Sequence, residues 1–416
     1  MRVYLETTGC RLNQSEIETL ARQFQHLGHT LVHAAEDADL CIVNTCAVTR
    51  EATRSSRNMI RRLNRANPEA QIVATGCYAH LSPEKVDALP GVTHVVDNVN
   101  KDRLVPLVLQ SEVPTEIFDL EPVVREPVAG ALGRTRAFVK VQDGCNNRCT
   151  FCVTTIARGP GRSRRLGDVV REVQALHAAG YQEAVLTGVH LGSYGHDFGQ
   201  QDGLAELVRA GLAHTDIPRL RLSSLEPWDL SPDFFTLWEN PRLCRHLHLP
   251  LQSGCDATLR RMARRTSQES FRALVAAARA QIPDLALSSD MITGFPGETD
   301  DEFETSYAFS QEMDFMKIHV FRYSQRAGTA AAHMAGQVPD AVKKARSARL
   351  LALSDAGAER FWARFIGQPQ RVLWEQVTGA SEAGFRNSGL TDNYIRMEMD
   401  APNALTNTIS TVVPIA

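Results

Sequence analysis

The sequence predicts an α/β protein in three parts: an N-terminal parallel α/β domain over residues 1–105, an open (βα)6 barrel over residues 135–365, and a small C-terminal β-barrel over residues 366–416. Short apolar strands that alternate with helical segments indicate the first two parts. Alternating polar and apolar side chains indicate the third. Residues 106–134 have little helical periodicity and place prolines among acidic residues, so we expect a linker there.

In the first domain, a cysteine follows each of three predicted strands. The strands span residues 2–5, 40–44 and 72–74, and the cysteines are Cys10, Cys46 and Cys77. Helices are expected over residues 15–27 and 53–67. Because ligands of parallel sheets gather beyond the carboxyl ends of the strands, we expect the three thiols to converge on one metal site. The alternative is that they are unrelated small core residues.

The predicted barrel has six strands, at residues 138–142, 183–186, 219–222, 246–249, 286–290 and 317–321. The segment is too short for eight βα units, which favours a partial barrel. Catalytic groups of such barrels come from the carboxyl ends of the strands, and small polar clusters stand at these positions here. A long helix is expected over residues 341–365, followed by strands at residues 371–376, 393–399 and 408–413.

Three cysteines follow the first barrel strand closely: Cys145, Cys149 and Cys152. Three thiolates from one loop suit an iron–sulfur or zinc site. A structural zinc site is closed by four protein ligands, whereas no other Cys or His lies within about ten residues here. A 4Fe–4S cluster held by three cysteines leaves one iron open to a small molecule. The alternative is three unpaired structural cysteines.

Composition limits the classes of protein to which the chain can belong. The 45 Lys and Arg against 48 Asp and Glu give a net charge of −3, so any nucleic-acid binding must be local. No apolar run reaches the roughly 18 residues that span a bilayer, and we expect no membrane association or signal peptide. Nine cysteines in a long, core-forming chain favour reduced thiols and a cytoplasmic location.

Seven short segments together resemble one family from end to end. They are residues 8–16 (TGCRLNQSE), 44–46 (NTC), 75–78 (TGCY), 141–147 (VQDGCNN), 157–160 (ARGP), 294–298 (GFPGE) and 391–394 (TDNY). The chain resembles the methylthiotransferase family of radical S-adenosylmethionine (SAM) enzymes. The resemblance implies an N-terminal methylthiotransferase domain, a radical SAM partial barrel and a C-terminal TRAM domain.

The resemblance also implies a reaction and its cofactors. Two 4Fe–4S clusters are expected, one on each cysteine triad, with SAM bound at the Cys145 cluster. Within the family, the chain is similar to the branch that methylthiolates C2 of N6-threonylcarbamoyladenosine beside the tRNA anticodon. The alternatives are isopentenyl-adenosine in tRNA, an aspartate of a ribosomal protein, or a non-catalytic iron–sulfur protein. The expected partners are tRNA and an electron-donating reductase or flavodoxin-type protein; the sequence gives no oligomeric state.

Candidate SAM contacts come from the polar clusters at the barrel strand ends and from one arginine further along. They are Thr187, Gly188, Ser224, Glu226, Gln252, Ser253, Arg264 and Asp290. Small residues at strand ends are also plain turn formers, which is the alternative for most of them. Candidate RNA contacts are Arg162, Arg164 and Arg165, because guanidinium groups pair with phosphates. A solvated charged surface is the alternative for these arginines.

Overall fold

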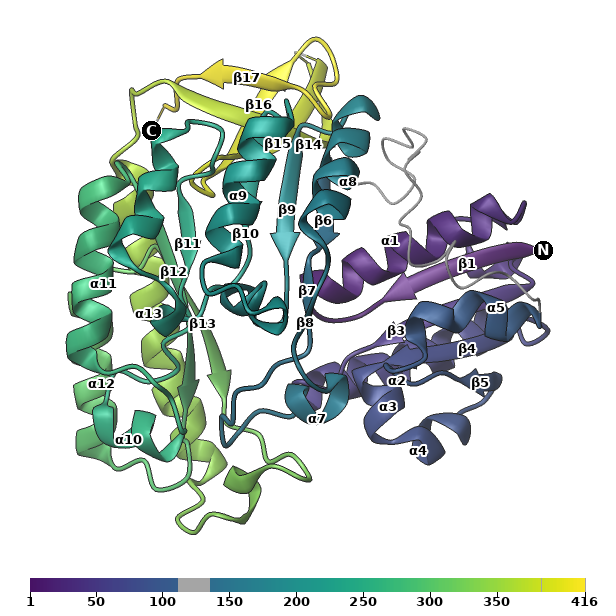
Figure 1. Ribbon diagram of the computed structural model, residues 1–416, viewed down its shortest axis with the longest axis horizontal. Coiled ribbons are helices and arrows are strands. Elements are labelled where there is room, and N and C mark those ends of the chain that lie inside the picture. The colour runs from purple at the N-terminus through teal and green to yellow at the C-terminus, as the bar shows by residue number, and fades with distance from the viewer. Residues whose placement is uncertain (111–134, 383, 416) are drawn as a thin grey trace.

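The fold confirms the predicted α/β class. A computed structural model describes residues 1–110, 135–382 and 384–415. The N-terminal domain lies beside the barrel, and the C-terminal sheet lies across one end of the barrel (Figure 1).

The N-terminal domain is a five-stranded parallel sheet in the order β2-β1-β3-β4-β5. Its strands are β1 (Arg2–Thr7), β2 (Thr30–Leu31), β3 (Leu40–Thr45), β4 (Gln71–Gly76) and β5 (Val92–Val95). One face packs on α1 (Arg11–His26) and α5 (Leu104–Leu109), and the other on α2 (Arg50–Ala66), α3 (Cys77–Leu81) and α4 (Pro83–Asp87). The central strand β3 is buried throughout, as its apolar sequence requires.

The barrel contains the six predicted parallel strands, in the order β6-β9-β10-β11-β12-β13. They are β6 (Arg136–Lys140), β9 (Glu183–Thr187), β10 (Arg219–Leu222), β11 (His246–His248), β12 (Ala286–Thr293) and β13 (Lys317–Arg322). Only isolated bridges join β10 to β11, such as Ser224 with His248. The outer helices are α8 (Leu166–Ala178), α9 (Gly203–His214), α11 (Gln268–Gln281), α12 (Asp300–Glu312) and α13 (Asp340–Ala363). Shorter elements are β7 (Gln142–Asp143), α7 (Thr154–Arg158), β8 (Arg162–Ser163) and α10 (Asp256–Arg261).

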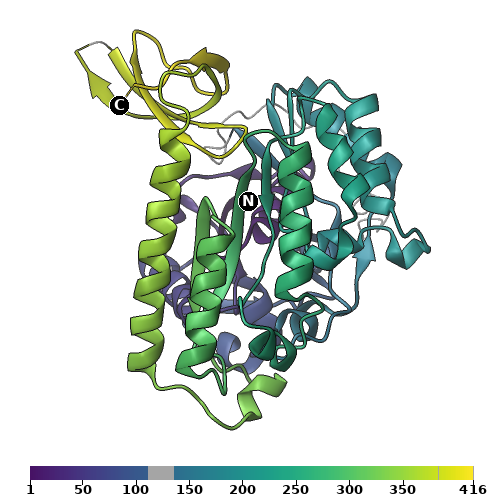
Figure 2. The ribbon, with the colours of Figure 1, turned by 90° about the vertical axis from the view of Figure 1, so that its left-hand side faces the viewer.

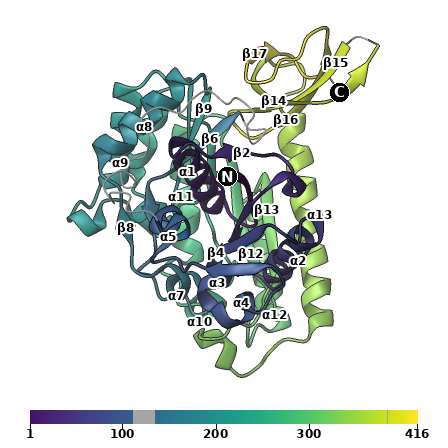
Figure 3. The same ribbon diagram turned by 90° about the vertical axis from the view of Figure 1, so that its right-hand side faces the viewer.

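The N-terminal domain packs against the open side of this partial barrel, at strand β6. Helix α1 lies along β6, and the Ser15 hydroxyl donates a hydrogen bond of 2.8 Å to the carbonyl oxygen of Phe138. Seen from the N-terminal side, the parallel sheet lies in front of the barrel strands (Figure 3). This arrangement lets the carboxyl ends of both sets of strands face a common space.

The C-terminal part is a curled antiparallel sheet in the order β16-β15-β14-β17, half of a barrel, seated at the end of α13 (Figure 2). Its strands are β14 (Gln370–Ser381), β15 (Gly384–Thr391), β16 (Arg396–Ala401) and β17 (Ile409–Val412). Strand β15 escaped prediction because its buried residues include Asn387 and Ser388, which give no apolar alternation.

A tyrosine fixes this sheet to the floor of the barrel. The Tyr394 ring lies 4.4 Å from the guanidinium carbon of Arg221, and its hydroxyl accepts hydrogen bonds from Arg11 (2.5 Å) and Arg136 (3.2 Å). Three guanidinium groups around one ring give a cation–π contact of substantial strength in a buried setting. The TDNY segment is therefore an anchor between domains.

The predicted domain limits stay predictions, with one adjustment. Helix α5 crosses the expected boundary at residue 105, and its Leu104 and Val105 are fully buried in the N-terminal core. Most of the expected linker, residues 111–134, lies outside the described residues. Among the helices that are described, none combines the length and the apolar character that a bilayer crossing requires.

Candidate functional site

A cavity of about 650 Å³ lies where the carboxyl ends of the barrel strands face the N-terminal domain. This volume is typical of a pocket for a small molecule. All six cysteines of the two predicted triads line it: Cys10, Cys46, Cys77, Cys145, Cys149 and Cys152. Both triads therefore lie on one cavity, at the carboxyl ends of the strands that precede them.

The N-terminal triad depends on tight backbone turns. Cys10 precedes α1, Cys46 follows β3, and Cys77 opens α3. A Cβ atom on Gly9, whose φ is +103°, would lie 2.8 Å from the Cys46 sulfur. A Cβ atom on Gly76, at φ +94°, would lie 2.3 Å from the Thr45 carbonyl oxygen. Only glycine lets these loops approach so closely.

Polar side chains hold the same loops in place. The Ser56 hydroxyl accepts a hydrogen bond of 3.0 Å from the Cys46 backbone N–H, and the Asn13 amide donates 2.8 Å to the Thr8 carbonyl oxygen. Burial raises the pKa of the Cys46 thiol to about 11. Burial also raises the pKa of Cys10, against the opposing charge of Arg158. Without a metal these two thiols stay protonated at neutral pH, so cationic iron must displace their protons.

The second triad lies in the loop after β7. Backbone N–H groups of Asn147 and Thr154 donate to the sulfurs of Cys145 and Cys152, each at 3.4 Å. The guanidinium of Arg264 lies 3.9 Å from the Cys149 sulfur. Burial raises the pKa of Cys149 to about 11, and Arg264 opposes that shift. Donors directed at sulfur are the surroundings that bound thiolates require.

A histidine also contacts this triad. Burial by itself lowers the pKa of His190. Hydrogen bonds to Asp229 and Cys145 outweigh this effect and raise the pKa of His190 to about 10. Its Nε2 lies 2.5 Å from the Asp229 carboxylate. Arg264 and His190 thus place two cationic groups beside the second triad.

The two triads fit clusters better than single ions. Within the described ranges, no group of three or more His, Cys, Asp or Glu side chains is arranged to hold one metal ion. In an iron–sulfur cluster each thiolate binds a different iron, so the three sulfurs need not meet at one point. The donors aimed at sulfur fit that group, and the assignment of the cysteines as its ligands stays a prediction.

Seven of the eight expected SAM contacts line the cavity: Thr187, Gly188, Ser224, Glu226, Gln252, Arg264 and Asp290. Ser253 is not among its lining residues; it is buried, and its hydroxyl accepts a hydrogen bond of 3.2 Å from the Cys255 N–H. Arg264 is held by Glu226 at 2.6 Å and stacks over the Trp228 ring at 4.3 Å. Cofactor contact by all eight residues stays a prediction.

The three arginines expected to contact RNA differ in their surroundings. The guanidinium of Arg164 lies 2.6 Å from Glu172 and donates to the Lys140 carbonyl oxygen. Arg162 is exposed and lies 3.4 Å from Asp143. Arg165 is exposed at the start of α8. The geometry gives Arg164 a structural role, and RNA contact by any of the three stays a prediction.

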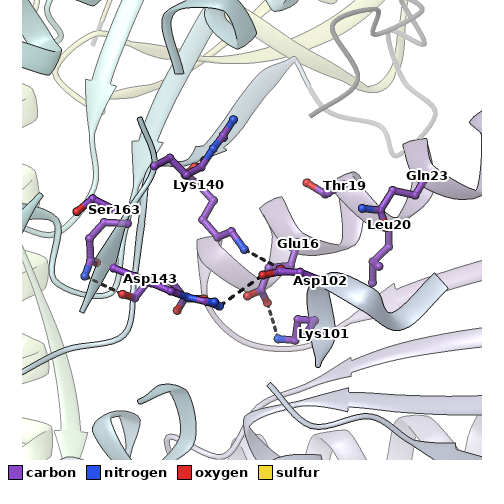
Figure 4. Close-up of a pocket in the computed structure, with 12 residues that line it drawn as sticks. Glu16, Thr19, Leu20, Gln23, Lys101, Asp102, Lys140, Asp143 and Ser163 are labelled. Atoms are coloured by element: carbon purple, nitrogen blue, oxygen red, sulfur yellow. Dashed lines mark hydrogen bonds and ion pairs between the residues drawn. The ribbon is translucent and has the colours of Figure 1, made fainter. Parts of the chain in front are cut away.

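A buried charge network joins the two domains beside the cavity, and the sequence analysis missed it. The Arg158 guanidinium lies 2.8 Å from Glu16 and 2.9 Å from Asp143, and Lys101 lies 2.7 Å from Glu16. Glu16, Lys101 and Asp143 also border a second, smaller cavity of about 200 Å³ between α1 and β7 (Figure 4). Glu16 and Arg158 both stand in the motif segments, but their pairing across 142 positions leaves no periodic signal.

Comparison with known proteins decides the family. A family model described as "Uncharacterized protein family UPF0004" matches residues 2–97, and the Radical SAM superfamily model matches residues 139–310. The "Threonylcarbamoyladenosine tRNA methylthiotransferase MtaB" of Bacillus subtilis is 36% identical over 403 residues, covering 95% of this chain and 89% of that protein. The chain belongs to the radical SAM methylthiotransferases.

Two further comparisons are consistent with this family, one with other methylthiotransferase sequences and one with solved structures. The protein of the same name from Thermotoga maritima is 36% identical over 409 residues, covering 95% of this chain and 91% of that protein. The "tRNA-2-methylthio-N(6)-dimethylallyladenosine synthase" of Acetivibrio thermocellus is 33% identical over 426 residues, covering 98% of this chain and 88% of that protein. Among solved structures, the chain is similar to the radical SAM methyltransferase TsrM of Kitasatospora setae, which was solved with cobalamin and a [4Fe-4S] cluster bound. The TM-score is 0.57 and the sequence identity is 17%, and the match covers 80% of this chain and 77% of that chain. That last likeness supports the fold alone.

As a radical SAM methylthiotransferase, the chain uses SAM and 4Fe–4S clusters, the cofactors of this family.

Proposed function

We propose that this protein is a tRNA methylthiotransferase that replaces the C2 hydrogen of N6-threonylcarbamoyladenosine beside the anticodon with a methylthio group. The observation that carries the proposal is the placement of two cysteine triads on one cavity. The relatives named for this nucleoside, at 36% identity over nearly the whole chain, support the choice of substrate.

In this proposal Cys145, Cys149 and Cys152 hold the cluster that binds SAM. The other triad, on the N-terminal domain, holds the auxiliary cluster. When bound, these groups supply the electron and the radical that break a strong C–H bond, together with the sulfur, chemistry that no side chain here can supply.

In this proposal the side chains of the cavity bind SAM and orient it. Arg264, fixed by Glu226 and Trp228, presents a cation beside Cys149, where it can pair with the carboxylate of SAM. The polar groups of Thr187, Ser224 and Asp290 line the same wall and can hold the amino and ribose groups. The Arg158 network holds the N-terminal domain against the barrel, which keeps both triads on one cavity.

Two further features belong to the proposal. The partner expected for this chemistry is an electron-donating reductase or flavodoxin-type protein, because a cluster held by Cys145, Cys149 and Cys152 would need an electron that protein side chains do not supply. Reduced cysteines around two clusters suit the cytoplasm.

Mass spectrometry of tRNA nucleosides from cells with and without this protein tests the substrate. We expect the methylthio derivative of threonylcarbamoyladenosine to disappear with the gene and to return with a wild-type copy. Loss of the methylthio derivative of dimethylallyladenosine instead would assign the activity that the Acetivibrio thermocellus relative is named for. Unchanged tRNA nucleosides would refute the proposal.

A further inference from the structure

Helix α2 carries a row of exposed arginines beside the auxiliary triad. The row consists of Arg50, Arg54, Arg57, Arg61 and Arg65. Their spacings of three and four residues place them on one side of the helix. At 1.5 Å per residue, the row extends over about 22 Å.

These five guanidinium groups have no ion pair or hydrogen bond with any residue that the structure describes. The nearby Arg62 pairs with Glu6, and Glu51 is the one acidic residue of the helix. Glu51 lies 3.6 Å from Arg322 and so leaves the row unneutralised. In a chain with a net charge of −3, a concentrated row of free cations calls for an anionic partner.

The row begins at the mouth of the main cavity. Thr49 caps α2 three residues after Cys46, and the contact between Arg322 and Glu51 ties the start of the helix to the edge strand β13. Two exposed apolar side chains line the cavity here, Val48 (51% exposed) and Phe321 (39% exposed).

Arg326, near the start of this row, also lacks an anionic partner among the described residues. Its Nε and one terminal nitrogen are buried and have no hydrogen-bond partner among the described residues. Burial and the neighbouring charge of Arg50 lower the pKa of Arg326, as expected for a guanidinium without an anionic partner.

The described residues of the C-terminal sheet offer no comparable row of arginines. Residues 366–416 contain three arginines against five acidic residues. Arg386 pairs with Asp400 at 3.1 Å, and Arg396 pairs with Glu375 at 3.2 Å. Phosphate contacts must therefore come from elsewhere on the molecule.

We propose that the arginine row of α2 binds the sugar–phosphate backbone of the substrate RNA, and that Phe321 stacks on a base at the cavity mouth. Single-stranded RNA loops are recognised in this way, by cations along the backbone and aromatic rings under unstacked bases. The proposal rests on the proposed function, because it takes tRNA as the substrate, and it adds the surface that brings the anticodon loop to the cavity.

The first test removes three charges from the row. The variant R57Q/R61Q/R65Q is compared with R171Q/R209Q/R272Q, which removes three exposed arginines from α8, α9 and α11. The probe is an unmodified tRNA transcript, titrated against the cluster-loaded protein at several salt concentrations.

Each lost phosphate contact lowers the salt slope by about 0.7 to 0.9, so the row variant should lose about two units. We expect at least about tenfold weaker binding at low salt. The control variant should bind as the wild type does.

None of these six arginines lines the cavity, so SAM cleavage without tRNA should stay at the wild-type level in both variants. Equal affinity and slope for the row variant and the control would overturn this inference while leaving the proposed function intact. A wild-type protein that binds no tRNA at all would overturn both.

The second test addresses the stacking ring. Phe321→Ala should weaken tRNA binding by roughly 5- to 100-fold, the range for the loss of one stacked base. Phe321→Tyr keeps the ring and should restore binding. The matched control is Phe385→Ala, which removes another exposed phenylalanine from β15 on the C-terminal sheet. A larger loss from the control than from Phe321→Ala would contradict stacking at the cavity mouth.

Discussion

The Arg158 guanidinium, at the end of α7, lies 2.8 Å from the Glu16 carboxylate, which joins the segment after Cys152 to the helix that begins next to Cys10. Both side chains are almost fully buried. Asn44, on the strand that leads to Cys46, donates to the same carboxylate at 2.9 Å. This buried ion pair therefore helps to hold the two triads at a fixed separation.

Replacing Arg158 with Ala should destabilise the protein by about 3–5 kcal/mol, because Asp143 and Glu16 lose a shared buried cation. The measurement is the free energy of unfolding in urea. Arg349→Ala is the control, since its pair with Glu304 is about half exposed and should contribute less than about 1 kcal/mol. Equal effects of the two substitutions would contradict a domain clamp.

Stability should also fall in acid through Glu16. Burial alone would raise the pKa of Glu16, but Arg158 and Lys101 hold this pKa well below its usual value of 4.5. A carboxyl with a lowered pKa contributes its full stability above about 4.5, and the contribution is lost as the pH falls below that value. Glu16→Gln should therefore be less stable than the wild type at pH 7, with a difference that shrinks toward pH 3. A constant difference across this range would show that the charge of Glu16 has no role.

Iron content tests the two triads. After anaerobic reconstitution, we expect about eight irons per chain, four for each cluster. Changing Cys145, Cys149 and Cys152 together to Ala should leave about half of that iron and abolish SAM cleavage. Cys244→Ala, which removes a buried cysteine outside the cavity, should change neither quantity. Loss of all the iron, or of none, would contradict two separate sites.

The roles of the triads separate in a single substitution. Cys46→Ala removes one ligand from the N-terminal triad and leaves the Cys145 loop intact. We expect 5′-deoxyadenosine still to form, because the proposal assigns SAM binding to the other triad, and we expect no methylthiolated nucleoside. Chromatography with mass detection measures both products. A wild-type yield of methylthiolated nucleoside would rule out a sulfur-carrying role for this triad.

The sequence correctly placed candidate site residues at one sheet edge where each of them directly follows a strand of a parallel sheet. Cys10, Cys46 and Cys77 stand after successive strands of a parallel sheet, so the sheet alone brings them to one edge. The six barrel strands were predicted to within a few residues, because short strand-like segments alternate with helical segments along this part of the chain.

Contacts between distant segments could not be predicted in this way. Tyr394 lies in a polar turn, and its ring contacts Arg221 and Arg11 from two other domains, which no local pattern indicates. Contact of Arg164 with RNA stays a prediction, but its ion pair with Glu172 on α8 gave no signal in the sequence. Whether an arginine is paired or open to solvent depends on how the domains pack, and the local sequence does not show that packing.

The most direct test of the central claim uses the reconstituted protein, SAM, a reductant and tRNA that already carries N6-threonylcarbamoyladenosine. We predict the 2-methylthio derivative of that nucleoside, formed by the wild type and by neither the Cys46→Ala nor the Cys149→Ala variant. SAM cleavage without any methylthiolated nucleoside, or a product formed equally by the variants, would contradict a methylthiotransferase built on two triads at one cavity.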